Sequence, residues 1–198
     1  FDAGVAGLDV LGGRILGTSN LAVSGATTYT GGQIGGDGGN VIANGGLSIG
    51  GAATKTLGRS GGAGSSGIVN NGTATWTGTG TIDNWGSGRF TNSAGANLDI
   101  QTDADFNNGT FINQGSLTKS VGATDGSDKT AIRALFNNSG SVNVTQGVLS
   151  LTGGGTHTGS FATGDSGWIE FAGSSSKPTH DLNAGASLTG NARMIDSF

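Results

Sequence analysis

A short phrase recurs along the chain: an apolar residue, any residue, an asparagine, and then a turn rich in Gly, Ser and Thr. It stands at positions 68–70, 82–84, 90–92, 106–108, 111–113 and 136–138. With one phrase taken per coil, at positions 68, 90, 111 and 136, the steps are 22, 21 and 25 residues. Short β-type segments with a period in this range indicate a solenoid, in which every coil stacks on the one before it.

Alternation of apolar and polar residues predicts the individual strands. It is clear at 73–82, and it predicts two strands at 141–144 and 148–151, separated by a turn at 145–147, and another at 168–171. Few windows longer than about ten residues escape a Gly, and each Gly costs a helix about 1 kcal/mol relative to Ala. The pattern therefore predicts an all-β solenoid of roughly eight or nine coils.

The chain divides into a less regular start and a long repeat region. Residues 1–20 are predicted to form an N-terminal capping coil, since the terminal repeats of solenoids are usually atypical. Residues 21–198 are predicted to form the β-helix repeats. The stretch 122–130 lacks strong apolar positions and is predicted to be a loop between coils, which explains the longer step of 25 residues. The chain opens on Phe1 without a signal peptide, so we expect a mature product or an internal piece of a longer protein.

Composition agrees with a folded protein that has a thin core. The 198 residues include 42 Gly but one Pro, with 33% apolar and 11% charged residues. Such a chain cannot build a thick globular core, but a solenoid needs only a narrow apolar column. The Gly residues are then expected to serve the turns.

Charge and Cys content limit the partners. The net charge is −4, so the chain lacks the basic surface that attracts phosphate backbones, and nucleic acid is not expected as a partner. Cys is absent, which excludes disulfides and fits an exported bacterial repeat protein as well as a cytosolic one. No apolar run approaches the roughly 20 residues of a membrane span, so no transmembrane segment is expected.

The recurring asparagines are predicted to lie at coil corners. Asn tolerates the left-handed backbone conformation better than most residues, and its side chain bonds nearby backbone groups. Stacked in successive coils, these side chains can also form an inward amide ladder, as in cross-β stacks. The alternative is that each Asn marks an ordinary surface turn. The residues concerned are Asn70, Asn84, Asn92, Asn108, Asn113 and Asn138.

Several longer phrases extend this pattern, at 75–78, 106–119, 136–151 and 153–157. They resemble the repeat modules of large exported bacterial β-helix proteins, the autotransporter-like and filamentous-haemagglutinin-like adhesins. The resemblance runs from about Leu21 to Met194. It implies a right-handed parallel β-helix that is secreted or displayed on a bacterial cell surface as part of a larger protein. It carries over no catalytic residue, because the shared residues are turn and core positions and such folds host many activities.

Two polar groups are candidates for chemistry. Asp99, Asp103 and Asp105 form the densest acidic group and are a candidate calcium site, although calcium needs about six to eight oxygen ligands and the alternative is a solvated acidic face. No other cofactor is expected. His157 and His180 lie 23 residues apart, about one coil, and can stack with Glu170 or Asp181 nearby. Without clustered ligand spacing, we expect two exposed polar residues rather than a metal or acid–base site.

The large aromatics Tyr29, Trp76, Trp85 and Trp168 are candidates for sugar stacking or subunit contacts, with core filling as the alternative. A second alternative is a polysaccharide lyase or glycosidase, because stacked coils can bring Asp83, Asp103 or Asp105 to within the roughly 5 to 9.5 Å that glycosidase carboxyls require. The basic residues are scattered singly, however, and few aromatics are available to line a sugar groove.

The expected function is structural and non-catalytic: an extracellular β-solenoid that acts as the subunit or stalk of a surface filament or adhesin. Self-association is expected, because an uncapped solenoid end presents unpaired backbone groups that another chain can pair with. The alternatives are a module that binds surface carbohydrate and a polysaccharide-cleaving enzyme.

Overall fold

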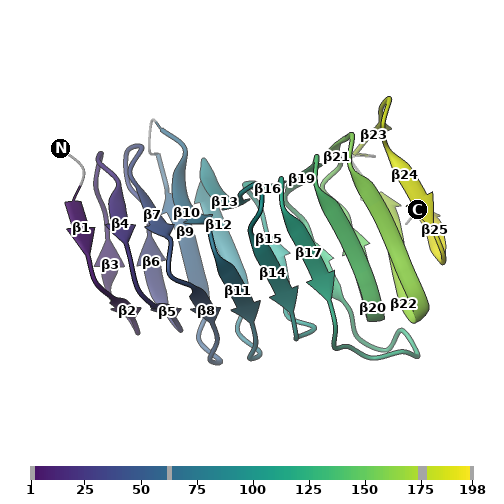
Figure 1. Ribbon diagram of the computed structural model, residues 1–198, viewed down its shortest axis with the longest axis horizontal. Coiled ribbons are helices and arrows are strands. Elements are labelled where there is room, and N and C mark those ends of the chain that lie inside the picture. Colours follow the sequence, from purple (N-terminus) through teal and green to yellow (C-terminus); the bar gives the residue numbers. More distant parts are fainter. Residues whose placement is uncertain (1–2, 62–63, 174–177, 197–198) are drawn as a thin grey trace.

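The computed structural model describes residues 3–61, 64–173 and 178–196 and is a β-solenoid of about eight turns built from parallel strands (Figure 1). No helix occurs in this described part. The predicted all-β, parallel coiled architecture is therefore confirmed. Residues 1–2, 62–63, 174–177 and 197–198, which belong to the predicted capping and repeat regions, lie outside the described residues.

Each coil contributes strands to three faces, which we name A, B and C. Face A is a nine-stranded sheet of β1 (Ala3–Val5), β4 (Leu21–Val23), β7 (Asn40–Ala43), β10 (Ser66–Asn70), β13 (Gly88–Asn92), β16 (Thr110–Asn113), β19 (Leu135–Asn138), β21 (Gly155–His157) and β23 (His180–Leu182). Face B follows A in every coil and comprises β2 (Leu8–Val10), β5 (Thr27–Tyr29), β8 (Leu47–Ile49), β11 (Thr73–Trp76), β14 (Asn97–Ile100), β17 (Ser116–Lys119), the first parts of β20 (Ser141–Leu151) and β22 (Ser160–Gly173), and β24 (Ser187–Thr189).

Face C comes next and returns the chain toward face A. It comprises β3 (Arg14–Ile15), β6 (Gly32–Ile34), β9 (Lys55–Arg59), β12 (Ile82–Gly86), β15 (Phe106–Asn107), β18 (Thr130–Ile132), the later parts of β20 and β22, and β25 (Ala192–Asp196). Because β20 and β22 run through both faces, B and C form one 16-stranded sheet.

The long strand β20 corrects the prediction of two strands at 141–144 and 148–151. One strand covers both segments, with a register shift between Val144 and Gln146 where it pairs with β22. Gly147, at φ 81°, adopts a backbone conformation that favours glycine. A bulge of this kind bends a strand without ending its pairing, so the chain turns from face B to face C while it stays in the sheet.

The strand register confirms the coil steps read from the recurring phrase. Ile68, Phe90, Phe111 and Phe136 are neighbours on successive strands of face A. The phrases at 82–84 and 106–108 lie instead on face C, where Ile82 pairs with Phe106. A coil can therefore use the same phrase twice, on two different faces.

A continuous column of apolar side chains fills the interior. On face A the ring centroids of Phe90 and Phe111 are 5.0 Å apart, and those of Phe111 and Phe136 are 5.3 Å apart. Phe106 on face C reaches the same column, with its centroid 5.0 Å from that of Phe111. Aromatic contacts at this spacing add to the gain from burying apolar area, so these rings help to hold successive coils together.

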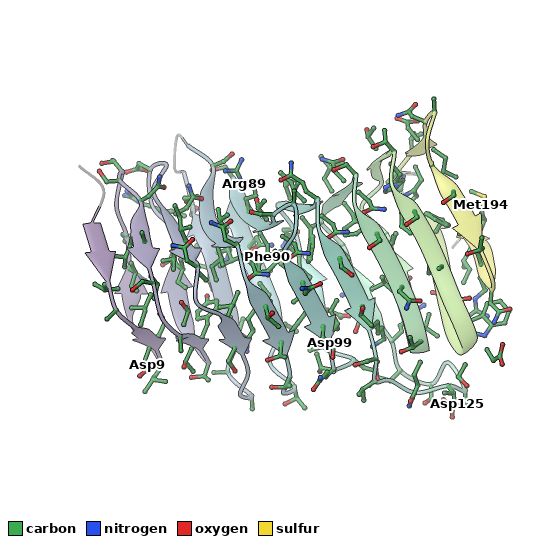
Figure 2. The ribbon with its side chains drawn as sticks, viewed as in Figure 1. Asp9, Arg89, Phe90, Asp99, Asp125 and Met194 are labelled. Carbon is green, nitrogen blue, oxygen red and sulfur yellow. The ribbon has the colours of Figure 1, made fainter. Side chains whose placement is uncertain are left out.

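The first coil is regular, whereas the segment between β17 and β18, which we call the long loop, has no strand. The strands β1, β2 and β3 pair with β4, β5 and β6, so residues 3–15 form a coil with the same three faces as the others. Residues 120–129, between β17 and β18, carry no strand. Asp125 of this segment lies at the lower edge of the molecule (Figure 2), and Lys129 at its end bonds Glu170 of β22.

Candidate functional site

Four of the six corner asparagines form one buried ladder along face A. Their side chains are at most 1% exposed. The Nδ2 groups of the first three donate to the Oδ1 of the next asparagine, at 2.9 Å from Asn70 to Asn92, 2.9 Å from Asn92 to Asn113, and 2.8 Å from Asn113 to Asn138. These bonds run from coil to coil and therefore along the axis of the rod.

The same amides also hold the turn between faces A and B. Every Nδ2 of the ladder donates to a backbone carbonyl in the next coil, where face B begins. The acceptors are Asn97, Ser116, Ser141 and Ser160, at 3.0, 3.0, 3.0 and 3.2 Å. An amide that is fully hydrogen-bonded can be buried without the penalty of an unpaired polar group. The ladder thus fixes both the stacking and the corner geometry.

The other two asparagines lie at a corner of face C. Asn84 is 2% exposed, and its Nδ2 donates to the carbonyls of Asn107 and Asn108 at 2.9 and 2.8 Å. Asn108 has φ 58° and is followed by Gly109 at φ 66°. Its exposed side chain donates to Asp83 Oδ1 at 3.0 Å. This is the left-handed turn that Asn and Gly adopt most readily.

His157 takes the next position of the ladder column, because it pairs in register with Asn138. The expectation that both histidines are exposed is wrong: His157 is 0% exposed and His180 is half-buried. The reason is packing, since the His157 ring centroid lies 5.1 Å from that of Phe161 and 6.1 Å from that of Phe171. The imidazole ring of His157 therefore ends the asparagine ladder and packs against the aromatic core.

The rings of His157 and His180 are stacked. Their ring centroids are 5.5 Å apart, and the planes differ by 15°. His180 Nε2 lies 3.1 Å from the Leu151 carbonyl oxygen, which only accepts, so in a neutral His180 it is Nδ1 that accepts, from His157 Nε2 at 3.2 Å. This tautomer leaves His157 Nδ1 buried and without a partner among the described residues. Burial, with the neighbouring His180 as a smaller cause, lowers the pKa of His157 to about 4, and burial also lowers the pKa of His180.

Acidification is expected to destabilise the solenoid through His157. The ordinary pKa of 6.5 applies to the unfolded chain, so the unfolded state takes up this proton first as the pH falls. The stability that depends on neutral His157 is on the order of 3 kcal/mol of the free energy of unfolding. It is fully present above pH 6.5 and is lost as the pH falls to about 4. Denaturant unfolding at pH 7, 5.5 and 4 measures it. His157→Asn, which extends the amide ladder without a titrating ring, should lose less stability over this range, and an equal loss in both proteins would contradict the assignment.

A buried ammonium lies at the corner between faces B and C. Lys119 is 0% exposed, and its Nζ lies 2.8 Å from the carbonyls of Thr102 and Val121, 2.8 Å from Asp103 Oδ1 and 3.0 Å from Thr130 Oγ1. Burial lowers the pKa of Lys119, while Asp103 opposes that shift. The site ties the long loop to two coils, and four oxygen acceptors surround Nζ, which suits an ammonium with three hydrogens.

Lys55 fills the same corner three coils earlier. It is also 0% exposed, and its Nζ donates to the carbonyls of Gly50 and Ala53 at 2.8 Å each. Burial lowers its pKa as well. Sequence reasoning missed both lysines. The signal was present in the alternation, because Lys119 follows Leu117 and Lys55 precedes Leu57 by two residues, which places each lysine on the inward side of its strand.

The three aspartates of the calcium candidate are not gathered into one site. Asp99 accepts from Ser120 Oγ and Gln101 Nε2, Asp103 from Lys119 Nζ and the Ala123 amide, and Asp105 from the Ala131 amide and Arg133 Nη1. Each carboxylate thus uses its two oxygens on donors of the chain itself. Within the described residues, no group of three or more His, Cys, Asp or Glu side chains could hold a metal ion.

Glu170 forms a second ionic cluster, on the outer side of face C. It is 1% exposed; its Oε2 accepts from Lys129 Nζ at 2.8 Å, and its Oε1 accepts from Arg193 Nε at 3.0 Å. Burial alone would raise the pKa of Glu170, but the bonds from Lys129 and Arg193 outweigh it and hold the pKa below its usual value. Arg193 also lies over the Trp168 ring, 5.2 Å from its centroid. The cluster joins the long loop to the last two coils.

The aromatic candidates separate into core and surface residues. Tyr29 is 0% exposed and its hydroxyl donates to the Thr56 carbonyl at 2.8 Å. Trp76 is 1% exposed, with its ring edge-on to Phe106. Both therefore fill the core and cannot touch a ligand outside it. Trp85 is 46% exposed on β12, while Trp168 is partly covered by Arg193.

Comparison of the sequence with protein-family models finds no match, and comparisons with curated proteins and with solved structures find none either. In the described part of the chain, no helix has the length and apolar character needed to cross a bilayer.

Proposed function

We propose that this chain is a structural, non-catalytic β-solenoid that serves as a subunit or stalk of an extracellular surface filament or adhesin. The single observation that carries the proposal is the asparagine ladder. Its side-chain hydrogen bonds join successive coils from β10 to β19 and are directed along the axis. In a stalk, tension acts in that direction, and buried polar networks that are fully satisfied give rigidity and a unique packing.

The chemistry-bearing side chains support the same proposal. Lys119 and Glu170 form ion pairs within the chain, and the carboxylates of Asp103 and Asp105 accept hydrogen bonds from the chain's own donors. A glycosidase needs one carboxyl that donates a proton and a second that attacks or activates water. Carboxylates held by lysine, arginine and backbone amides are poorly suited to either role.

Carbohydrate binding is supported less well. A sugar platform needs aromatic faces that are open together, whereas Trp76 is in the core and Arg193 lies over Trp168, which leaves Trp85 as the half-exposed ring of the three tryptophans. The extracellular placement is supported by the resemblance of the repeats to those of exported bacterial β-helix proteins.

Single-molecule stretching between handles at the two ends tests the proposal. A stalk of this kind is expected to unfold in steps of one coil, about 20–25 residues each, or roughly 70–90 Å of released chain. Unfolding in one event without coil-sized steps would contradict a load-resisting ladder. Release of sugars from a panel of polysaccharides would contradict the non-catalytic assignment.

A further inference from the structure

The long loop, residues 120–129, lies at the corner between faces B and C and contacts several coils. It leaves β17 and returns to β18 of the same coil. Figure 1 shows it along the lower edge of the molecule, toward β20 and β22, and Asp125 marks that edge in Figure 2. A repeat of a solenoid ordinarily contacts only the repeats beside it. The contacts of the long loop extend further than that.

The start of the long loop is bound to the preceding coil, which comprises β13, β14 and β15. Ser120 Oγ donates to Asp99 Oδ1 at 2.6 Å, and the Ala123 amide donates to Asp103 Oδ2 at 3.1 Å. The buried ammonium of Lys119 bonds the other oxygen of Asp103 at 2.8 Å. These three bonds hold the first half of the loop on the coil that precedes it.

The long loop also contacts the following coil, which comprises β19 and the strand β20. Gln146 Nε2 donates to the Gly122 carbonyl at 3.1 Å, and Thr145 Oγ1 donates to the Lys119 carbonyl at 3.2 Å. Glycine permits this approach, because a Cβ at Gly147 would lie 2.8 Å from the Cα of Gly122, closer than real side chains come. The loop therefore packs directly on the bulge where β20 turns from face B to face C.

The end of the long loop reaches one coil further, to β22. Lys129 Nζ lies 2.8 Å from Oε2 of Glu170, whose side chain is 1% exposed. Ser150 of β20 pairs in register with Glu170, so Lys129 passes over the coil between them. In the described coils from β1 to β12, the one ion pair joins Arg59 to Asp37 of the neighbouring coil, and these side chains are 51% and 43% exposed. The long loop differs from that pair by linking coils that are not neighbours.

We propose that the long loop is an axial strap that makes the coils from β13 to β22 open as one cooperative block, whereas the coils from β1 to β12 open singly. A solenoid whose coils contact only their neighbours can lose them one at a time. A link that skips a coil couples the opening of the coils it spans, because each of them must give up a bond to the same loop. This rests on the proposed stalk function and specifies which part of the stalk resists load.

Native-state hydrogen exchange at increasing denaturant concentration tests the proposal. In the unmodified chain, the most protected amides of β14, β17, β20 and β22 are expected to share one opening free energy, while those of β5, β8 and β11 open more readily and at different values. Lys129→Met releases the last anchor. The β22 amides should then exchange about 5- to 10-fold faster and no longer share the value of β17. Different opening free energies for β17, β20 and β22 in the unmodified chain would overturn the strap.

Arg59→Met is the matched control, because it removes an ion pair of similar length and exposure that joins neighbouring coils. Both substituted side chains are more than 40% exposed, so folding should persist. The control should leave the common value of β17, β20 and β22 unchanged, and an equal acceleration of β22 exchange in both variants would overturn the role of the long loop.

The stretching experiment separates this inference from the proposed function. Besides coil-sized steps, the strapped block should yield in one step of roughly 70 residues, the chain from Asp103 to Glu170, or about 230 Å. Coil-sized steps throughout would overturn the strap and still support the stalk function. Release of sugars from polysaccharides would overturn the stalk function, and a shared opening free energy would still support the strap.

Discussion

Replacing one ladder asparagine by aspartate, in Asn92→Asp, is expected to lower the free energy of unfolding at pH 7 by roughly 3–5 kcal/mol. The two side chains have nearly the same shape, so the change isolates the loss of the donor. Asn92 Nδ2 gives one hydrogen to Asn113 Oδ1 and one to the Ser116 carbonyl. A carboxylate would place an acceptor against both of these acceptors in a site that is 0% exposed.

The loss should depend on pH, with a defined sign. Burial among acceptors raises the pKa of the introduced carboxyl in the folded state above the roughly 3.9 of an unfolded Asp. Near pH 4 and below, the protonated acid can donate one hydrogen bond, and the variant is least destabilised relative to the unmodified chain. As the pH rises above the unfolded pKa, folding must either hold the proton or bury the charge, so the deficit grows.

Asn71→Asp is the matched control for this experiment. Asn71 stands next to the ladder residue Asn70 but is exposed, and it bonds Asn44 and Ser93 on the outer side of the same corner. Water can replace those partners, so we expect a loss below about 1 kcal/mol. Denaturant unfolding of both variants at pH 7 and pH 4 measures the difference. Equal losses in the two variants would show that the ladder contributes no more than a surface corner.

The sequence was sufficient to predict the coil repeat because the repeat is local. The phrase that ends in Asn70, Asn92, Asn113 or Asn138 combines a strand, an inward polar position and a turn, and stacked register followed from its spacing. The same phrase ending in Asn84 belongs to another face and does not join the ladder. A pattern of period two gives the side of a strand but not the face of the coil to which the strand belongs.

The burial of Glu170 depends on segments distant in the sequence, and the burial of His157 depends on the strand that follows it. Alternation places Glu170 on the outward side of β22, and it is buried there because Lys129 at the end of the long loop and Arg193 of the last coil bond it. His157 is buried because Phe161 and Phe171 pack against it from the next strand. Such contacts depend on how loops and coils of different lengths come together, which local propensity does not encode.

The corner occupied by Lys119 leads to the second large expected effect. Lys119→Met keeps most of the side-chain length but removes the ammonium, and we expect the free energy of unfolding to fall by about 3–5 kcal/mol, the usual cost of breaking a buried ion pair. The variant leaves Asp103 and the Thr102 and Val121 carbonyls without their shared donor. Because Val121 lies in the long loop, cleavage of that loop by added protease should also become faster than in the unmodified chain.

Two further variants separate the buried charge from a general loss of lysine. Lys129→Met removes a lysine that is 42% exposed, and Arg193 still neutralises Glu170, so a loss near 1 kcal/mol is expected. The double variant Lys119→Met with Asp103→Asn removes the charge on both sides and should recover part of the loss, because the penalty comes largely from the unpaired carboxylate. Additive losses in this double-mutant cycle would instead mean that the ammonium acts through the two carbonyls, and the long loop would then be held by backbone contacts rather than by the ion pair.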